Sequence, residues 1–261
     1  MNLKTKENFI ADQALSYGLN NDLLQKLSVV VNDKDGMFEP NKEGSTEHYL
    51  SVGIQALNII VKNLSIINVD TPKKILDFGC GHGRVMRFLS AYFPNTEMIG
   101  TEVIEDCIDF CSNTFGVKTF ISTPDFSNLP QNLDAQVVWA GSVFTHISEK
   151  RYKELLRYFS ASLSSGGIAV FTTHGRKAEE FVKKRVYGLS AFNTKKILFQ
   201  YNLNGFGYAD YMEIKNYGTS INTPAWFCKM LKKEFPEFRL ISYTEQYWDN
   251  HQDVICIQKI C

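Results

Sequence analysis

One stretch, "KKILDFGCGHGRVMRFL" from Lys73 to Leu89, constrains the fold of this chain more than any other. It begins as an apolar run, breaks at three alternating glycines, and resumes with helical spacing. This pattern predicts a buried strand, a tight turn and a helix. In doubly wound sheets, ligands bind at the carboxyl ends of the strands, so the glycine turn marks a candidate binding site.

The segments that follow alternate between strand and helix patterns. Strands are predicted at "KKILDFG", "EMIGTEV", "VKTFIS", "AQVVWAG" and "GIAVFTT", with helices at "GRVMRFLSAYF", "IEDCIDFCSNTF" and "SEKRYKELLRYFSASL". Such alternation indicates parallel pairing with right-handed crossovers. A helix at "PAWFCKMLKKEF", capped by Thr223, precedes the strands "FRLISYTEQYW" and "DVICIQKI", and their short connection permits only an antiparallel hairpin. We therefore predict an α/β fold with a doubly wound, mostly parallel seven-stranded sheet whose last strand runs antiparallel.

Three parts of the chain are expected. Residues 1–69 form a helical cap, with helices over "NDLLQKLSVVV" and "EHYLSVGIQALNIIVKNL", and Ser45 or Thr46 is the candidate cap of the latter. Residues 70–185 and 221–261 form the Rossmann-like core. Residues 186–220, rich in aromatic residues and glycine, are predicted to be an insertion that covers the active face and contains a hairpin.

Composition narrows the classes of function. Lys and Arg together number 28, as do Asp and Glu, so no global charge favours a nucleic-acid partner. The basic clusters "KKILF", "FVKKR" and "KMLKKEF" are expected to be solvated helix faces. No apolar run approaches the roughly 18 residues of a membrane span, and "MNLKTKENFIADQ" lacks the apolar core of a secretion signal. The six cysteines form no zinc pattern, so we expect a cytoplasmic protein with reduced thiols and no metal site. The sequence does not determine the oligomeric state.

The residues around the glycine turn favour a cationic nucleoside over a dinucleotide. A dinucleotide fingerprint has its third glycine one residue later than Gly83, where this chain has Arg84. Asp77 stands two residues before Gly79, where a carboxylate opposes a pyrophosphate but suits an ammonium group. Glu102 closes the second predicted strand and can accept hydrogen bonds from ribose hydroxyls.

After the third predicted strand, Asp125 and Phe126 offer an acceptor for an adenine amine and an apolar wall for its ring. The segment "WAGSVFTHI", which closes the fourth predicted strand, can line the other side.

These segments resemble the class I S-adenosylmethionine-dependent methyltransferases. "ILDFGCGHGR" resembles the first motif of that family, "IGTEV" the second, "PDFSNLP" the adenine-contacting segment, and "LDAQVVWAGSVFTHIS" and "SGGIAVFTT" the fourth and fifth strands. The chain departs from the family at Glu102, where Asp is commoner, and at His82, where many members have a small or apolar residue. The resemblance implies S-adenosyl-L-methionine as cofactor, S-adenosyl-L-homocysteine as product, and cofactor contacts from Asp77, Phe78, Gly79, Gly81, Glu102, Val103, Asp125, Phe126 and Ala140.

The sulfonium methyl of that cofactor is already activated, so the protein mainly aligns the acceptor. A hydroxyl acceptor needs a base, whereas a carboxylate or a neutral amine does not. Candidate bases follow the predicted strands: His174, the first candidate, His146 and His251, each of which can instead be a hydrogen-bonded structural residue. Four aromatic residues can form an acceptor wall or simply pack the insertion: Tyr208, Tyr211, Tyr217 and Trp248.

The leading hypothesis is a methyltransferase acting on a small molecule or a glycan, with oxygen as the expected acceptor atom. The layout resembles bacterial methyltransferases of surface-polysaccharide or secondary-metabolite pathways. An NAD(P)-dependent oxidoreductase is the alternative, which the early third glycine and the reversed final strand disfavour. A non-catalytic partner subunit that keeps the fold is a further alternative, and the intact glycines disfavour it.

Overall fold

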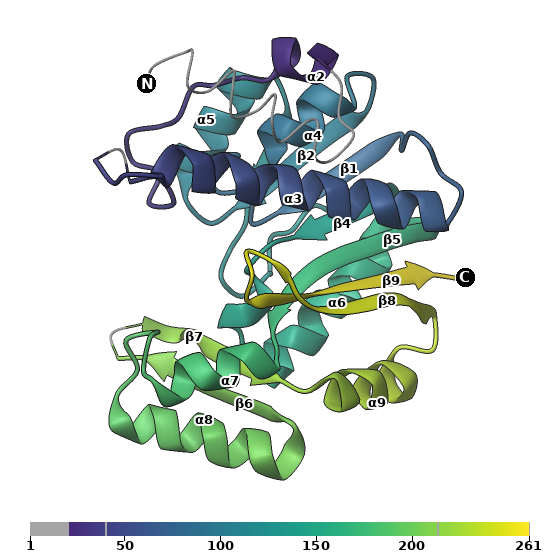
Figure 1. Cartoon of the computed structure of the whole chain (residues 1–261). Helices are drawn as coiled ribbons and strands as arrows, with labels where there is room; N and C mark the ends of the chain where they lie inside the picture. Colours follow the sequence, from purple (N-terminus) through teal and green to yellow (C-terminus); the bar gives the residue numbers. More distant parts are fainter. Residues whose placement is uncertain (1–20, 40, 213, 261) are drawn as a thin grey trace. The chain divides into compact units, whose positions relative to one another are not determined.

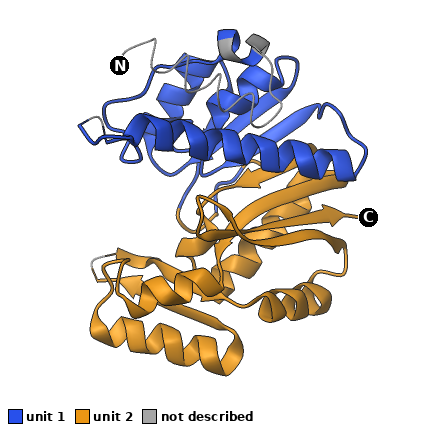
Figure 2. Cartoon of the chain, in the orientation of Figure 1, with its two compact units in different colours: residues 1–123, 127–129 blue, residues 124–126, 130–261 orange. Residues whose placement is uncertain are grey.

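A computed structural model describes residues 21–39, 41–212 and 214–260 (Figure 1). The chain divides into two compact units, coloured separately in Figure 2. Unit 1 contains residues 1–123 and 127–129, and unit 2 contains residues 124–126 and 130–261. The first 20 residues of the predicted helical cap, and Cys261, lie outside the described residues.

Unit 1 contains three parallel strands and the helices packed on them. Pairing is parallel between β1 and β2, with Asp77 opposite Gly100, and between β2 and β3, with Glu102 opposite Ile121. All three strands lie where the sequence predicts them. The elements are α2 (Asn21–Lys26), α3 (Ser45–Ile66), β1 (Lys74–Phe78), α4 (Met86–Tyr92), β2 (Glu97–Glu102), α5 (Glu105–Phe115) and β3 (Lys118–Ile121).

The helix predicted over "NDLLQKLSVVV" is wrong beyond its first half, because α2 ends at Lys26. The backbone carbonyls of Ser28 and Val30 instead accept hydrogen bonds from Nη1 of the buried Arg87, at 3.1 and 3.0 Å. Those carbonyls satisfy a buried guanidinium, which a continued helix would leave without acceptors.

Helix α3 begins differently from the prediction. Its N-cap is Gly44, in the left-handed conformation with φ 75°, so neither Ser45 nor Thr46 caps it. The Ser45 hydroxyl accepts the Glu39 N–H at 2.9 Å and so closes the preceding loop. The side chain that could have capped the helix is therefore already engaged.

Helix α3 is a core helix. A Cβ atom at Gly53 would lie 2.5 Å from the Arg84 carbonyl oxygen and from the Phe88 ring, so α3 and α4 are in close contact. Among the described residues, α3 alone has the length and hydropathy of a membrane span, and 61% of that window is buried inside the structure. The buried core helices of soluble proteins pass the same test of length and hydropathy, so one such helix is weak evidence for a membrane span.

Unit 2 contains the remaining strands of the main sheet. Pairing is parallel between β4 and β5, and antiparallel between β5 and β9 and between β8 and β9. Thr223 caps α9 as predicted, by accepting the Trp226 N–H at 3.1 Å. The elements are β4 (Ala135–Ala140), η1 (Phe144–His146), α6 (Glu149–Ser162), β5 (Leu163–His174), α7 (Arg176–Lys183), α8 (Ala191–Asn204), β6 (Phe206–Tyr211), β7 (Ile214–Asn222), α9 (Pro224–Glu234), β8 (Phe238–Trp248) and β9 (Gln252–Lys259).

The strands form a seven-stranded sheet in the order β3-β2-β1-β4-β5-β9-β8, with β9 antiparallel to its neighbours. This confirms the predicted fold class. Gly-rich and Pro-rich breaks delimit the strands, and the hairpin β8–β9 reverses the final strand because its connection is too short for a crossover.

Residues 186–220 hold α8 and most of the β6–β7 hairpin, which pairs antiparallel. With α7 they share a small core of their own: Ala178, Val182, Leu189, Ile197, Tyr201, Ala209 and Ile221. The assignment of this segment as a cover for the active face stays a prediction.

Candidate active site

The glycine turn of unit 1 exposes bare backbone. Gly79, Gly81 and Gly83 have φ of 74°, 52° and 74°, a region that L side chains rarely adopt. The N–H groups of Gly79 and Cys80 both donate to the Thr101 carbonyl, at 2.8 and 3.0 Å, which anchors the turn to β2. A Cβ atom at Gly81 would meet nothing within 4 Å, so a ligand can approach the main chain there.

Gly83 is required for packing as well as for conformation. A Cβ atom at this position would lie 2.3 Å from the Phe115 ring and 3.1 Å from Sγ of Cys111. The glycine therefore lets the start of the α4 segment lie directly against α5.

Gly83→Ala should lower the free energy of unfolding by about 2–5 kcal/mol, because overpacking adds to the strain of a positive φ. Urea unfolding monitored by circular dichroism measures the change. Gly81→Ala is the matched control, because it carries the conformational strain without the clash and should lose about 1–2 kcal/mol. Equal losses in the two variants would contradict the packing explanation.

Asp77 is a buried carboxyl at the end of β1. It is 1% exposed, and its Oδ2 has no hydrogen-bond partner among the described residues. Burial, and then the charge of Glu102, raises the pKa of Asp77 to about 7. A buried acceptor left without a donor calls for an explanation, and a cationic ligand group beside the turn supplies one.

Glu102 borders the same turn. Its Oε2 accepts the Gly81 N–H at 3.2 Å, and its Oε1 accepts the Val103 N–H at 2.6 Å. Val103 is 47% exposed, whereas Phe78 is buried. Unit 1 thus brings together six predicted cofactor residues: Asp77, Phe78, Gly79, Gly81, Glu102 and Val103.

The residue at the family departure, His82, ties the turn to its surroundings. Its Nε2 lies 2.9 Å from Oδ2 of Asp106, in the first turn of α5, and its Nδ1 lies 3.5 Å from Sγ of Cys107. The Lys34 ammonium, and then His82, lowers the pKa of Asp106. The sequence alone showed that His82 is an unusual residue at this position. It did not predict the contact with Asp106 or the pairing of Asp106 with Lys34, because these residues are distant along the chain.

The other predicted cofactor residues belong to unit 2. Asp125 is exposed, and Phe126, with φ 61°, lies under the Arg151 guanidinium at 5.4 Å. Arg151 also donates to the Pro124 carbonyl at 2.9 Å, which holds this segment to α6. Ala140 is buried at the end of β4.

Unit 2 brings the three predicted histidines together. The ring centroids of His146 and His174 are 6.4 Å apart, and those of His174 and His251 are 5.9 Å apart. A backbone carbonyl can only accept, so each neutral ring carries its proton on Nδ1 and keeps the lone pair of Nε2. The distances from Nδ1 to oxygen are 2.8 Å for His146 to Gly218, 3.2 Å for His174 to Ser220 and 2.7 Å for His251 to Asp249.

The environments of these histidines differ. His174 is 3% exposed and stacks on Tyr187 at 4.8 Å. Burial, then the charges of His146 and His251, lowers the pKa of His174 to about 3. The pKa of His146 is also lowered by burial, but its hydrogen bond with Gly218 opposes the shift. His174 is therefore the weaker proton acceptor of these two rings.

Two of the predicted aromatic residues lie beside His146. Tyr217 stacks on its ring at 4.7 Å, and the Tyr211 hydroxyl lies 3.2 Å from its Nδ1. Trp248 is buried against Trp139 instead, with ring centroids 5.6 Å apart. The Tyr208 hydroxyl is bonded to Asp210 within β6.

A hydrogen-bonded set of residues that sequence reasoning missed adjoins His251. Ser142, with φ 60°, donates its backbone N–H to Oγ1 of Thr172 at 2.7 Å. Its hydroxyl oxygen accepts a hydrogen bond from Nε2 of Gln252 at 2.8 Å. Nε2 of Gln252 also lies 3.5 Å from Nε2 of His251. The alternation of side chains along a strand could have suggested Thr172, because Thr172 and His174 are two residues apart and share a face of β5.

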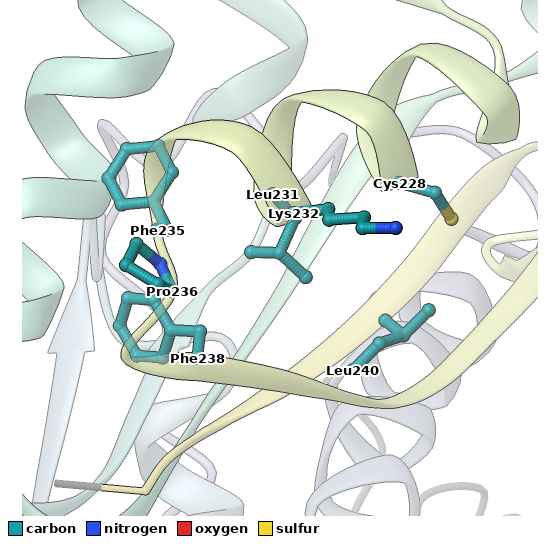
Figure 3. Close-up of a pocket in the computed structure, with 7 residues that line it drawn as sticks. All are labelled: Cys228, Leu231, Lys232, Phe235, Pro236, Phe238 and Leu240. Atoms are coloured by element: carbon teal, nitrogen blue, oxygen red, sulfur yellow. The ribbon is translucent and has the colours of Figure 1, made fainter.

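A groove of about 320 Å³ lies along α9 and the start of β8 in unit 2 (Figure 3). It is lined by Cys228, Leu231, Lys232, Phe235, Pro236, Phe238 and Leu240, none of them a predicted site residue. Among the described residues, no group of three or more His, Cys, Asp or Glu can hold a metal ion.

Comparison with known proteins identifies a domain type and a fold. Residues 75–167 match a family described as "Methyltransferase domain". A trans-aconitate 2-methyltransferase of Rhodopseudomonas palustris (strain BisB5) is 25% identical over 126 residues, which are 48% of this chain and 48% of that protein. The match therefore spans about half the length of this curated relative.

Solved structures share the fold. An S-adenosylmethionine-dependent methyltransferase of Clostridium acetobutylicum ATCC 824 superposes with a TM-score of 0.55 at 16% identity, covering 79% of this chain and 92% of that one. A 1,6-didemethyltoxoflavin-N1-methyltransferase of Burkholderia thailandensis does so with a TM-score of 0.54 at 13% identity, covering 81% and 80%. The chain therefore has the class I methyltransferase fold, and its residues 75–167 match a methyltransferase domain.

Proposed function

We propose that the whole protein transfers the methyl group of S-adenosylmethionine to an oxygen atom of a small-molecule or glycan acceptor. The observation that carries the cofactor assignment is the buried Asp77, whose Oδ2 lacks a partner among the described residues beside a glycine turn open to a ligand. When bound, the cofactor supplies a methyl group already activated by its sulfonium charge.

The residues of unit 1 fit such a cofactor. Asp77 would face its ammonium group, because a raised carboxyl pKa falls when a cation arrives. Glu102 would accept the ribose hydroxyls, for which its oxygens retain free lone pairs. The backbone between Gly79 and Gly81 permits close approach, as its conformation shows.

The remaining cofactor contacts stay proposals. Phe78, Val103 and Ala140 would supply apolar surface. Asp125 and Phe126 would meet the adenine amine and ring.

His146 is our proposed general base for a hydroxyl acceptor. Its Nε2 carries the lone pair, its ring is half-buried, and Tyr217 and Tyr211 hold it from two sides. A base with a pKa near 3, as at His174, takes a proton poorly from a hydroxyl at neutral pH. His174 and His251 would then position His146 and the acceptor.

One relative and one structural neighbour support a small molecule as the acceptor. Their names specify trans-aconitate and 1,6-didemethyltoxoflavin, which are small molecules of different chemistry. Because the named reactions differ, the acceptor of this chain and the oxygen assignment rest on the histidine cluster. Cytoplasmic location and the absence of a nucleic-acid partner stay expectations.

Calorimetric titration with S-adenosylmethionine, S-adenosylhomocysteine and NAD separates the proposal from the oxidoreductase alternative. We expect the first two to bind and NAD to give no heat, since Asp77 repels a pyrophosphate. Labelled S-adenosylmethionine, incubated with panels of hydroxylated, carboxylated and amine acceptors, then tests the acceptor atom. Binding of NAD alone would overturn the proposal, and labelling only of amines would overturn the oxygen assignment.

Glu102→Ala should weaken S-adenosylmethionine binding by about 1–3 kcal/mol, the usual effect of losing a charged hydrogen-bond acceptor. Isothermal calorimetry measures the change. Glu105→Ala, which removes an exposed carboxylate three residues further along, should leave the affinity unchanged. Unchanged affinity in Glu102→Ala would show that the ribose contacts other residues.

A further inference from the structure

Helix α8 carries an apolar stripe on its outward side. Phe192, Phe199 and Leu203 are 75%, 68% and 67% exposed. At 100° per residue these positions fall within a narrow arc of the helix, opposite the buried Thr194, Ile197 and Tyr201. Single exposed apolar residues are ordinary, but three large ones in line mark an interaction surface.

The stripe lies in a basic segment of a chain that is neutral overall. From Phe181 to Ala209 the sequence has no Asp or Glu, whereas its five basic residues are Lys183, Lys184, Arg185, Lys195 and Lys196. Lys195 and Lys196 are exposed and lie on opposite sides of the stripe. Lys183 pairs with Glu179 at 2.6 Å, whereas neither Lys195 nor Lys196 forms an ion pair with the described residues.

We propose that this surface, the α8 face formed by Phe192, Lys195, Lys196, Phe199 and Leu203, docks the protein on an anionic lipid bilayer. Aromatic and leucine side chains flanked by lysine are the composition of helices that lie in a membrane interface. The apolar tips would enter the acyl boundary while the lysines reach the lipid phosphates. The α8 face is the outer side of a single helix, which suits a broad, deformable bilayer.

The spacing disfavours a helical partner or a second copy. A coiled-coil seam needs apolar residues at both the a and d positions of a heptad. With Phe192 and Phe199 at a, the d positions hold Lys195 and Asn202. With the two Phe residues at d, the a positions hold Lys196 and Leu203, so either register places a lysine in the seam. Single-stranded nucleic acid can stack on Phe rings, but it gains nothing from Leu203.

Sedimentation of the full chain with vesicles tests the proposal. We compare vesicles of phosphatidylcholine alone with equimolar phosphatidylcholine and phosphatidylglycerol, at low and high ionic strength. We expect binding to the anionic vesicles only, weakened by salt. Both Lys195→Glu/Lys196→Glu and Phe192→Ser/Phe199→Ser should reduce the partition coefficient about tenfold or more.

Matched controls separate this surface from general charge and apolar effects. Lys232→Glu/Lys233→Glu reverses two adjacent exposed lysines on α9, and Met37→Ser removes an apolar residue that is 61% exposed in unit 1. Both controls should bind anionic vesicles as the wild type does. Thermal unfolding should be unchanged in every variant, since the substituted side chains are exposed.

Several results would overturn the proposal. One is equal binding to neutral and anionic vesicles, and another is binding that survives both α8 variants. Capture of an oligonucleotide without vesicle binding would assign the α8 face to nucleic acid. A dimer in light scattering that the Phe variant dissociates, without vesicle binding, would assign it to a second copy. None of these readouts depends on cofactor binding or methyl transfer, so the proposed function is tested separately.

Discussion

Asp77→Asn should weaken S-adenosylmethionine binding about tenfold or more and yet make the protein more stable at pH 8. The affinity falls because the amide cannot offer a negative charge to the cofactor ammonium. The stability rises because Asp77 is buried and its Oδ2 has no hydrogen-bond partner among the described residues, so ionising the carboxyl there is unfavourable.

The direction of the pH dependence follows from the raised pKa. The folded protein holds the Asp77 proton up to about pH 7, whereas the ordinary value is 3.8, so the native state binds more protons between these limits. Stability from this group is therefore full below about pH 4 and declines as the pH rises to about 7. The difference corresponds to about 4 kcal/mol at most, and Asn removes the decline.

Urea unfolding of the cofactor-free protein at pH 5 and pH 8 measures the effect, and calorimetry measures the affinity. The advantage of Asn over Asp should be larger at pH 8. Asp109→Asn, on the exposed side of α5, is the control and should change neither quantity. If the stability difference between Asp77→Asn and the wild type did not vary with pH, ionisation of Asp77 in the folded protein would not be unfavourable.

His146→Gln should lower kcat by a factor of about 10²–10⁴, the usual contribution of a general base. Gln keeps a side chain of similar polarity but cannot accept the proton. Because burial lowers the pKa of His146 below the ordinary histidine value of 6.5, the ring is mostly neutral at any pH above 6.5. The acid limb of the wild-type kcat/KM profile should therefore lie below pH 6.5, and it should disappear in the variant.

Steady-state kinetics on the acceptor found by the panel provide the measurement. His174→Gln should have a smaller effect on kcat, since the pKa of His174, about 3, already makes it a poor proton acceptor. His48→Gln, on the exposed side of α3, is the control and should be neutral. A larger loss in His174→Gln than in His146→Gln would restore His174 as the first candidate.

Local patterns in the sequence were sufficient to predict most of the elements. The turn at Gly79–Gly83, the stop of α5 at Gly116 and the cap at Thr223 each depend on the backbone preferences of residues within one turn. The reversed final strand followed from the length of one connection. These features are short in range, so a single sequence contains them.

The errors arose where contacts outside the helix itself decide. The helix after Asn21 ends at Lys26 because Arg87 takes up the carbonyls of Ser28 and Val30. The first turn of α3 lacks its expected cap because Ser45 bonds to Glu39. Propensity alone favours the longer helix and the hydroxyl cap. The tertiary contact of Arg87 overrides the first, and a loop contact six residues away overrides the second.

The sequence by itself determined where the chemistry-bearing residues lie relative to the strands. The glycine turn, Asp77, Glu102 and the three histidines each lie at or after the end of a predicted strand. Only the tertiary structure decided that Asp77 is buried with its Oδ2 unpartnered among the described residues. It also decided that the ring centroids of His146 and His251 lie 6.4 and 5.9 Å from that of His174, and that the pKa values of His146 and His174 fall to different degrees. The physical reason is that periodicity and turn chemistry are properties of neighbouring residues. Desolvation and hydrogen-bond partners are properties of the folded surroundings.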